Sequence, residues 1–525
     1  MSRVCVIGPI WLLATCLSCQ KVSATTYEEV LANYGVLNTV AGTAQYIDAG
    51  INGWLPEMEG DEATSAELSR PHMAMADWLG NIYIADKDAN AIRKVTPDGL
   101  ITTVVGTNLP GYNGDGPGID TQVFQPNGLY TFPNGTTYIL DLGNSMIRKL
   151  GLDGEVTTVV EDFAGIVAGR GLWVSPDEQT IVYTSGTDVR RWTAEVGVET
   201  IASGFVELGN IAIDPTDGLL VVTDRLGHTV SKIDGDGNIT RVAGNATTSG
   251  GGDGFSALET GLNEVRGIAF NPDGGYFLAT HRDSQIWYVD ESDMMHLMID
   301  GDRHDVHSGD GLPISTPGLK VSEIRAVTLA PNGDMIITEH DGGYIRVVDN
   351  VNPWVMGDVN LNHELDVDDL ERLIEAAATG DNPQTLDFTF DGLVNSDDVT
   401  VWVEEIKRTY LGDANVDGEF NSVDFVQVFQ FGQYEDSVEG NSTWRSGDWN
   451  GDGDFNSSDL VVAFQSGGYE AGPRAARAVP EPVSFGWHVL CLVVFYLRKC
   501  SGPRSWENSK WGIETTFSGY QNGVG

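Results

Sequence analysis

Cysteine is absent from most of this sequence. The five cysteines are confined to two apolar terminal segments: Cys5, Cys16, Cys19, Cys491 and Cys500. None occurs between Thr25 and Leu490. Disulfides, on which many exported proteins depend, are therefore excluded from the body of the chain. Its stability must come from packing and from any metal ions that it binds.

Positive charge is also scarce. The 525 residues include 30 Lys and Arg against 76 Asp and Glu, a formal net charge of −46. This excess argues against nucleic acid as a partner and against binding of anionic membrane surfaces through basic patches. We expect part of the negative charge to be solvated surface and part to be metal ligands. The length predicts two or three domains.

Familiar catalytic motifs are missing as well. The sequence contains neither the GxSxG motif of many hydrolases nor the HExxH motif of zinc proteases. It therefore predicts no catalytic residue and no organic cofactor, and the protein leans toward a non-enzymatic role.

The first 24 residues are typical of a secretory signal. Arg3 precedes an apolar run over 4–17, and Val22-Ser23-Ala24 is a small-residue cleavage site. Cleavage is expected after Ala24, so the protein is predicted to be exported. The alternative is a lipoprotein signal that ends at Cys16.

Residues 34–350 repeat a unit of short apolar strands separated by Gly, Asn and Asp. The clearest copy combines Gly80–Asp86, Asn90–Val95 and Ile101–Val105. Six such copies, roughly 40 to 60 residues apart, predict antiparallel blades of a propeller. The last copy lacks its final strand, whereas residues 35–43 match the closing strand of other copies. We expect this N-terminal strand to complete the sixth blade and close the ring.

The stretch GNIYIADKDANAIRKVTPDGLITTVVGT, followed by GYNGDGPGIDTQVFQPNGL, resembles the NHL-repeat family of six-bladed propellers. The resemblance implies an all-β, NHL/TolB-like propeller. It also implies an alternative function, because some relatives are lactonases or lyases with a divalent metal in the central channel. The candidate ligands would be the residues at the ends of the second strands: Asp86, Asp141, Asp224, His281 and Glu339.

A structural interpretation of these five residues competes with the catalytic one. Repeated positions report architecture more often than chemistry, so they are expected to be blade-turn residues that hydrogen-bond a loop. A second, looser group combines His296, His304 and His307 with Asp300, Asp302 and Asp305. Its spacing matches no zinc motif.

Acidic loops alternate with apolar segments after residue 353. Asp413–Asp424 and Asp448–Asp459 carry oxygen side chains at loop positions 1, 3, 5, 9 and 12, with glycine at position 6. Ca²⁺ takes six to eight oxygens, and position 7 supplies a backbone carbonyl. Asp358–Asp369 and Asp387–Asp398 are weaker copies, with His363 at position 6 and Thr389 at position 3 respectively.

Four calcium sites are therefore predicted. The expected ligands are Asp358, Asn360, Asn362, Glu364, Asp366 and Asp369; Asp387, Thr389, Asp391, Leu393, Asn395 and Asp398; Asp413, Asn415, Asp417, Glu419, Asn421 and Asp424; and Asp448, Asn450, Asp452, Asp454, Asn456 and Asp459. Helices are expected to follow the loops at 370–377, 399–406, 425–429 and 460–464.

These loops differ from ordinary EF-hands. Position 12 is Asp, and Gly357, Gly412 and Gly447 stand where an entering helix would end. The pattern resembles type I dockerin repeats, which implies two small helical modules at 355–408 and 411–470, calcium binding and docking to a cohesin-like protein. The alternative is that the calcium modules are structural spacers.

The C-terminal region resembles a PEP-CTERM sorting signal. A linker at 471–478 leads to a segment at 479–499, in which Val479-Pro-Glu-Pro482 precedes an apolar run and Arg498-Lys499. The resemblance implies a transient membrane segment that an exosortase-type enzyme processes. The apolar run is short for a bilayer of about 30 Å. The tail at 500–525 is longer than that family usually carries.

Two function classes follow from these predictions. The first is an exported calcium-binding surface or extracellular protein, whose propeller binds a carbohydrate or peptide ligand and whose calcium repeats dock a partner. The second is a propeller enzyme of the lactonase or lyase type, or a component of a polysaccharide-degrading assembly. A ring of convergent Glu, Asn, Asp or His side chains at one mouth of the channel would favour the enzyme.

Overall fold

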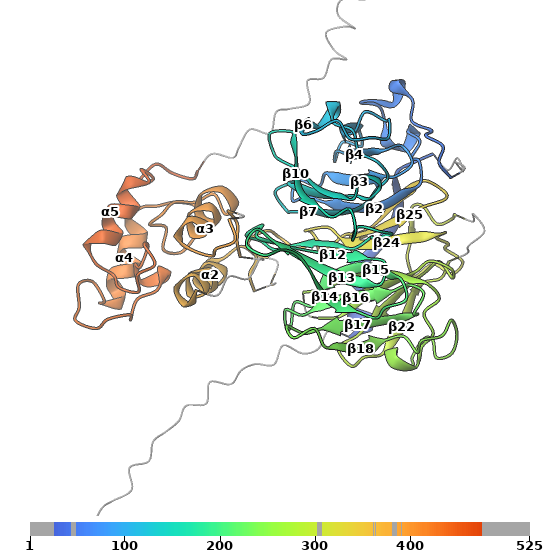
Figure 1. The fold of residues 1–525 in the computed structure, drawn as a ribbon. Helices are drawn as coiled ribbons and strands as arrows, with labels where there is room; N and C mark the ends of the chain where they lie inside the picture. The colour runs from blue at the N-terminus through green and yellow to red at the C-terminus, as the bar shows by residue number, and fades with distance from the viewer. Residues whose placement is uncertain are drawn as a thin grey trace, which may run out of the picture. The chain divides into compact units, whose positions relative to one another are not determined.

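A computed structural model describes residues 26–43, 49–272, 274–301, 307–360, 362, 364–380, 386–389 and 391–474. Six antiparallel sheets are arranged around a central axis (Figure 1). The chain therefore contains a six-bladed β-propeller, as the repeats predicted. The predicted signal, the C-terminal sorting segment and the tail lie outside the described residues.

The blades follow one another along the chain. Blades one to three are built from β2 (Pro71–Ala76), β3 (Ile82–Asp86), β4 (Ala91–Val95) and β5 (Ile101–Val105); β6 (Gly116–Pro117), β7 (Pro126–Thr131), β8 (Thr137–Asp141), β9 (Met146–Leu150) and β10 (Glu155–Glu161); and β11 (Leu172–Val174), β12 (Thr180–Ser185), β13 (Asp188–Thr193) and β14 (Gly197–Ser203).

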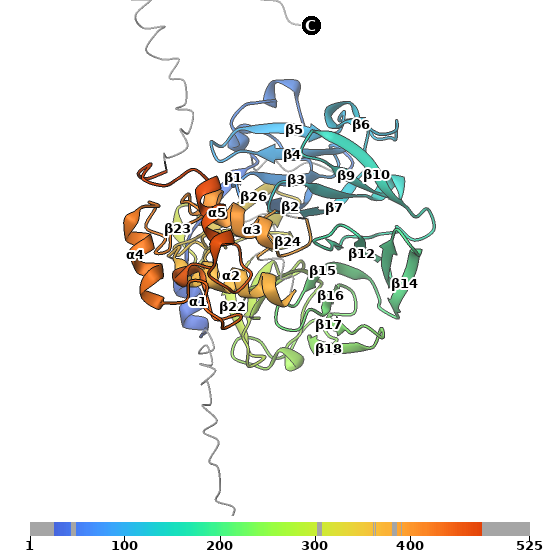
Figure 2. The same ribbon diagram turned by 90° about the vertical axis from the view of Figure 1, so that its left-hand side faces the viewer.

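Blades four to six complete the ring. They are built from β15 (Leu208–Ile213), β16 (Leu220–Asp224), β17 (Thr229–Ile233) and β18 (Ile239–Ala243); β19 (Val265–Phe270), β20 (Tyr276–Thr280), β21 (Gln285–Val289) and β22 (Met295–Ile299); and β24 (Ile324–Leu329), β25 (Met335–Glu339), β26 (Tyr344–Asn350), β1 (Tyr34–Ala41) and β23 (Leu312–Pro313). In Figure 2, first strands such as β2, β7 and β15 lie near the centre and last strands such as β5 and β18 lie outside.

The N-terminal strand closes the propeller. A capped helix, α1 (Tyr27–Asn33), leads into β1, which pairs antiparallel with β26, for example Thr39 opposite Arg346. Leu37 is fully buried in this sheet. The predicted closure of the sixth blade by the N-terminal strand is therefore confirmed. Closure pairs the backbone groups that an open β26 edge would expose.

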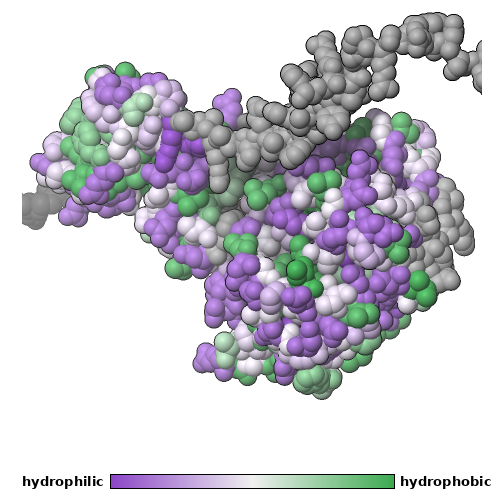
Figure 3. All heavy atoms as spheres, turned by 90° about the horizontal axis from the view of Figure 1, so that it is seen from above, coloured by the Kyte–Doolittle hydropathy of each residue, from purple (hydrophilic) through white to green (hydrophobic). Residues whose placement is uncertain are grey.

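Apolar side chains pack between neighbouring blades. One cluster joins Tyr83 and Ile92 of blade one to Leu129 and Ile139 of blade two. Each aliphatic side chain that is fully buried in this way stabilises the fold by about 1.5–3 kcal/mol. Outside these layers, hydrophilic and hydrophobic residues are interspersed on the surface shown in Figure 3.

Short helices follow the acidic loops. They are α2 (Val367–Thr379), α3 (Ser396–Val401) continued by a π-helical turn (Trp402–Ile406), α4 (Ser422–Phe431) and α5 (Ser457–Gln465). Among the described residues, no helix is long and apolar enough to cross a membrane. Short 3₁₀ turns complete the elements: Pro56–Met58, Ala63–Ser65, Gly118–Asp120, Leu142–Asn144, Ala257–Glu259 and Trp444–Ser446.

The helices start earlier than predicted. All four were expected to begin directly after position 12 of the preceding loop, but all four begin at position 10. The reason is that the position-9 side chain caps the helix: Asn421 accepts a hydrogen bond from the Val423 N–H at 2.8 Å. The Asp at position 12 completes a capping box with the N-cap backbone, here Asp424 with Asn421.

One hydrophobic cluster underlies all four helices. It includes Leu373, Trp402, Phe420, Trp444 and Phe455, from both predicted modules. The modules are also joined by ion pairs from Arg445 to Asp368 and Glu371. The two predicted repeat pairs thus share a core.

Candidate functional site

The predicted carboxylates at the ends of the second strands are buried behind the channel wall. Each accepts backbone N–H groups from the loop that leads into the inner strand of its own blade. The contacts are Ser69 N to Asp86 at 2.5 Å, Phe124 N to Asp141 at 2.7 Å, Val206 N to Asp224 at 2.8 Å and Ser322 N to Glu339 at 2.8 Å. These bonds agree with the structural interpretation, in which the carboxylates hold a loop.

Three of these carboxylates also face a buried arginine of the next strand. The pairs are Asp86–Arg93 at 3.2 Å, Asp141–Arg148 at 3.7 Å and Glu339–Arg346 at 3.4 Å. Burial raises the pKa of Asp141 to about 6, although Asn144, the Phe124 N–H and Arg148 act in the opposite direction. The arginines of the repeated Ile-Arg dipeptides therefore supply internal counter-charges.

His281 does not belong to this set, which corrects the predicted alignment. In blade five, Thr280 pairs with Val265 just as Asp86 pairs with Pro71 in blade one. His281 is the following residue and is equivalent to Lys87. The degenerate fifth repeat concealed this shift of one residue, which places His281 at the channel mouth.

Charged side chains converge at that mouth. They come from the loops that lead into the inner strands, from the inner strands themselves, and from the residues just after the second strands. We call this group the mouth cluster: Arg70, His72, Lys87, Asp88, Arg170, Glu207, Arg225, Glu264, Arg266, His281, Arg282, Glu323, Arg325, His340 and Asp341.

Ion pairs connect the mouth cluster from blade to blade. They are Arg70–Asp341 at 3.0 Å, Arg225–Glu264 at 3.7 Å and Arg170–Glu207 at 3.5 Å. Between blades five and six the contact is with a neutral imidazole instead: His281, whose pKa burial lowers to about 4, lies 3.4 Å from Glu323. Blade two contributes an amide instead, since Asn127 Nδ2 donates to the backbone oxygen of Gly169. Sequence reasoning missed all of this cluster except His281, because its members occupy different positions of divergent repeats.

The mouth contains three carboxylate or imidazole groups close enough to hold a metal. Ligand atoms of Glu323, His340 and Asp341 lie within 4.8 Å of one another. However, Arg70 Nε lies 3.2 Å from Nε2 of His340, and Arg325 Nη2 lies 3.1 Å from its Nδ1. Two guanidinium cations at these distances would repel a divalent ion. The residues present therefore do not fit the channel metal that a lactonase would need.

Both histidines beside these arginines are neutral. Burial, together with Arg325, holds the pKa of His340 well below its usual range. Burial and the nearby Lys87 do the same to His72.

The described residues of the second predicted histidine group lie apart from one another. His296 pairs with Asp290 at 2.9 Å, His307 with Glu339 at 2.7 Å, and Asp300 is bound by Lys320 at 3.0 Å. His304, Asp302 and Asp305 lie outside the described residues. The described histidines thus have separate partners and do not converge on one point.

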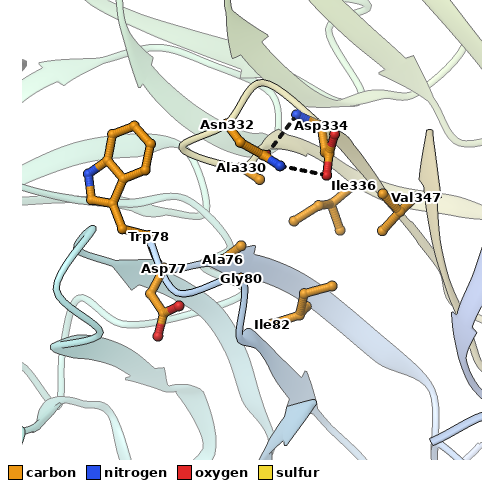
Figure 4. Close-up of a pocket in the computed structure, with 10 residues that line it drawn as sticks. All are labelled: Ala76, Asp77, Trp78, Gly80, Ile82, Ala330, Asn332, Asp334, Ile336 and Val347. Carbon is orange, nitrogen blue, oxygen red and sulfur yellow. Dashed lines mark hydrogen bonds between the residues drawn. The ribbon is translucent and has the colours of Figure 1, made fainter. Parts of the chain in front are cut away.

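A small cavity lies between blades one and six, at the ends of the inner strands away from the mouth (Figure 4). Ala76, Trp78, Ala330 and Ile336 are among its lining residues, and its volume is about 90 Å³. Sites for small molecules usually measure about 300–1,000 Å³. This cavity is too small for such a ligand.

The fourth acidic loop (448–459) brings three predicted calcium ligands together. Carboxylate oxygens of Asp448, Asp452 and Asp459 lie within 4.8 Å of one another. Asp448 and Asp459 are buried, whereas Asp452 is exposed. Burial, with the charge of Asp459 adding to it, raises the pKa of Asp448 to about 6. Such a cluster of oxygens is the environment that a hard divalent cation prefers.

Backbone N–H groups hold the position-12 carboxylates in each loop. Asp459 Oδ1 accepts from Trp449 N at 2.9 Å, and its Oδ2 accepts from Asn456 N at 2.9 Å. The equivalent bonds are Val359 N and Asp366 N to Asp369, and Ala414 N and Asn421 N to Asp424. In the second acidic loop Asp398 accepts from Asn395 N in the same way, but its other bond comes from position 3, Thr389 N.

Position 1 is likewise buried and bonded to the loop. Asp413 accepts from Gly418 N at 2.8 Å, and burial raises its pKa to about 6. Gly418 itself has φ 98°, which a side chain would disfavour. In the first acidic loop (358–369), the equivalent His363 lies outside the described residues.

The side chains at positions 3 and 5 complete the third and fourth acidic loops. Asn415 Oδ1 accepts from Asp417 N at 3.0 Å, and Asp417 Oδ1 accepts from Glu419 N at 3.0 Å. Asn450 and Asp452 make the same bonds in the fourth acidic loop, at 2.8 and 3.0 Å. In these two loops the oxygens of positions 1, 3, 5, 9 and 12 are thereby fixed by the backbone in a common arrangement.

Two buried tryptophans, which sequence reasoning missed, anchor the starts of loops. Trp402 Nε1 donates to the backbone oxygen of Gly357, and Trp444 Nε1 donates to that of Asp413, both at 2.7 Å. Thr409 also donates to the Asp413 carboxylate. No spacing rule pointed to these residues, because the contacts span 45 and 31 positions of the chain.

Comparisons with known proteins are limited to parts of the chain. No protein-family model matches it. It is 33% identical over 140 residues to teneurin-3 of Mus musculus, and 32% identical over 105 residues to teneurin-3 of Danio rerio. These matches cover 23% and 17% of this chain but only 5% and 4% of the teneurins.

Solved structures with similarity include a structural genomics protein of unknown function from Bacteroides thetaiotaomicron VPI-5482. It is 16% identical with a TM-score of 0.48, over 60% of this chain and 75% of that one. An auxiliary nutrient binding protein from the same strain has 12% identity and a TM-score of 0.45, over 60% of this chain and 76% of that one. A gluconolactonase of Xanthomonas campestris is 12% identical with a TM-score of 0.41, over 62% of this chain and 93% of that one. The assignment of a six-bladed propeller rests on the sheet topology itself.

Proposed function

We propose that this chain is an exported calcium-binding protein of the cell surface or extracellular space. In this proposal the four acidic loops bind Ca²⁺, and the propeller provides a rigid platform for a ligand. The observation that supports calcium binding is the convergence of Asp448, Asp452 and Asp459, whose carboxylate oxygens lie within 4.8 Å of one another. Bound Ca²⁺ would neutralise carboxylates that the fold otherwise holds together at an electrostatic cost.

Calcium titration of the full chain by calorimetry tests this function. Asp452→Asn removes a charge at position 5, where the side chain would be a ligand. Asp454→Asn removes the same charge two residues later, at position 7, where only the backbone carbonyl would bind. We expect Asp452→Asn to abolish or weaken one site and Asp454→Asn to leave all sites intact. Equal effects of both variants, or no uptake at millimolar calcium, would refute the proposal.

The docking role belongs to the same proposal. Helices α4 and α5 expose apolar side chains, including Val423, Val426, Phe429, Val461 and Phe464 at 47–58% exposure. Exposed apolar groups on neighbouring helices are typical of protein-binding surfaces. A cohesin-like or other cell-surface protein is the proposed partner. The competing role is that of a calcium-stabilised spacer. Val426→Asp should weaken partner binding if the surface docks a partner, and should change no interaction if the modules are a spacer.

The proposed location rests on sequence patterns outside the described residues. Residues 1–24 would direct export, and 479–499 would anchor the chain transiently until an exosortase-type enzyme processes it. Mass spectrometry of the protein from its native host tests both steps. Mature ends near Ala24 and near Pro480 are expected, whereas an intact 525-residue chain would contradict the proposal.

The enzymatic alternative is less well supported by the mouth of the channel. Convergent Glu and His side chains are there, as an enzyme would require. Arg70 and Arg325, however, face His340 at 3.2 and 3.1 Å and occupy the place of a metal. The mouth is better suited to binding than to metal-dependent catalysis.

A further inference from the structure

The mouth cluster concentrates positive charge in an acidic protein. It contains seven of the 30 Lys and Arg residues of the chain, but only five Asp and Glu. The seven cations are Arg70, Lys87, Arg170, Arg225, Arg266, Arg282 and Arg325. A protein with a net charge of −46 gains nothing for solubility from such a cluster at one channel mouth.

Positive charges from several blades act on Arg325. Arg325 extends from blade six, and burial lowers the pKa of its guanidinium to about 9, with the charges of Arg170, Arg70 and Arg225 acting in the same direction. These three come from blades three, one and four. Asp341, the carboxylate that favours the charged form of Arg325, is already paired with Arg70 at 3.0 Å. The mouth therefore holds more positive charge than its own carboxylates neutralise.

Polar atoms inside the cluster also lack partners among the described residues. Nε2 of His72 makes no hydrogen bond, although the side chain is 7% exposed, and its ring centre lies 4.7 Å from that of His340. Nε and Nη1 of the buried Arg266, and Nε of Arg325, likewise make no hydrogen bond among the described residues. A buried donor without a partner is unfavourable, so a bound molecule that supplies acceptor oxygens here would be stabilised.

The remaining carboxylates hold the arginines in place. Glu207 binds both Arg170 and Arg225, at 3.5 and 2.6 Å, and Glu264 binds Arg282 at 2.6 Å. The guanidinium groups are thereby oriented before any ligand arrives. Preorganised guanidinium forks match the two oxygens of a carboxylate, or those of a tetrahedral oxyanion.

We propose that the mouth cluster binds a small anionic ligand whose oxygens contact the arginines on the Arg325 side and on the Arg170 side of the channel. This inference deepens the proposed role of the propeller as a binding platform, and it does not depend on calcium binding. The ligand chemistry is an oxyanion, either a carboxylate or a tetrahedral group such as sulfate.

Calorimetry on the full chain with saturating Ca²⁺ tests the proposal. Glutarate serves as the dicarboxylate probe, sulfate as the tetrahedral probe, and glutaramide as the neutral control. We expect glutarate or sulfate to bind and glutaramide not to bind. The probe that binds identifies the source of the anionic group. Absence of binding by both anions up to about 10 mM, a concentration at which a site with a Kd of about 5 mM would be mostly occupied, would overturn the proposal.

Variants locate the site. Arg325→Gln is expected to weaken anion binding about tenfold or more, because it removes a charge-assisted contact. Arg191→Gln is the matched control, since Arg191 is an exposed arginine of β13 that pairs with Glu199. If Arg325→Gln fails to fold, Lys87→Gln, at the rim of the mouth, replaces it with the same expectation. Unchanged anion affinity in the mouth variant would overturn the proposal.

The calcium arm keeps the two proposals separate. Asp452→Asn is expected to reduce calcium uptake and to leave anion affinity unchanged. If the natural protein takes up calcium but binds neither anion, only the mouth-site proposal is refuted. If it binds an anion but takes up no calcium, only the calcium proposal is refuted.

Discussion

Asp86 illustrates how one buried side chain serves the architecture of a blade. Its carboxylate binds the Ser69 N–H at 2.5 Å and the Arg93 guanidinium at 3.2 Å. Arg93 in turn stacks on Trp54, 3.6 Å from the ring centre, and donates to Asn108 at 2.6 Å. A single charge therefore connects the inner loop, the third strand and the loop that leads to the next blade.

Arg93→Leu should be strongly destabilising. It leaves the fully buried Asp86 carboxylate without its cation, and breaking a buried pair costs about 3–5 kcal/mol. The exposed pair Arg191–Glu199 provides the control, because Arg191→Leu should change the free energy of unfolding by less than about 1 kcal/mol. Urea unfolding followed by tryptophan fluorescence measures both. Similar losses in the two variants would contradict the role assigned to Arg93.

Asp141 should make stability depend on pH. Its folded pKa of about 6 lies above the unfolded value near 3.8, so the folded state binds a proton more tightly. The stabilisation is therefore present below pH 4 and is lost as the pH rises through 6. The loss amounts to about 3 kcal/mol for a shift of this size.

Asp141→Asn removes this dependence. Relative to the natural protein, the variant should gain about 3 kcal/mol in free energy of unfolding between pH 4 and pH 7.5. Urea unfolding at the two pH values gives the difference for each protein. Parallel pH profiles would show that the Asp141 carboxyl is not perturbed.

At the scale of elements, local rules account for the blades and the helix starts. Alternating strands and Gly or Asn turns predicted the hairpins of blades one and two. The acidic loops predicted helices behind them, yet all four helices begin about one turn earlier than expected. The position-9 and position-12 side chains belong to the loop and also form the capping box of the helix. Because the helix starts were predicted from the spacing of apolar residues, the polar cap residues were not counted as part of the helix.

Two glycines at the acidic loops test this element directly. Gly418 has φ 98° and open space around its missing Cβ, so Gly418→Ala should cost only the strain of a left-handed backbone, about 1–2 kcal/mol. Gly447 has φ 112°, and an added Cβ would lie 2.4 Å from the ring of the buried Phe455. Gly447→Ala should therefore cost clearly more. Thermal unfolding of the two variants compares them, and equal losses would contradict the packing argument.

At the scale of the whole molecule, the propeller depends on a contact between distant ends of its sequence. Strand β1 pairs with β26 across about three hundred residues, for example Asn38 with Val347. Without β1, the edge of β26 would expose unpaired backbone groups.

A chain that begins at residue 44 should therefore aggregate or unfold at lower temperature than one that begins at residue 25. A chain that ends at residue 474 is the control, because it removes more residues but no described strand. Light scattering and thermal unfolding measure both effects. A stable monomer without β1 would show that ring closure is dispensable.

The sequence by itself determined the number of blades, the closure of the ring and the positions of the acidic loops. These features depend on periodicity, turn residues and ligand spacing, which are local and therefore visible in the order of residues. It also predicted the ligand residues at each loop position, because those residues lie within twelve positions of one another.

Only the tertiary structure decided which charges meet. The mouth cluster combines residues from Arg70 to Asp341, and the register of β20 moved His281 into it while leaving Thr280 in the wall. The buried tryptophans Trp402 and Trp444 reach loop backbones far along the chain for the same reason. Closing a ring brings equivalent ends of six sheets to one point, and no local pattern encodes which side chains stand there when the repeats have diverged.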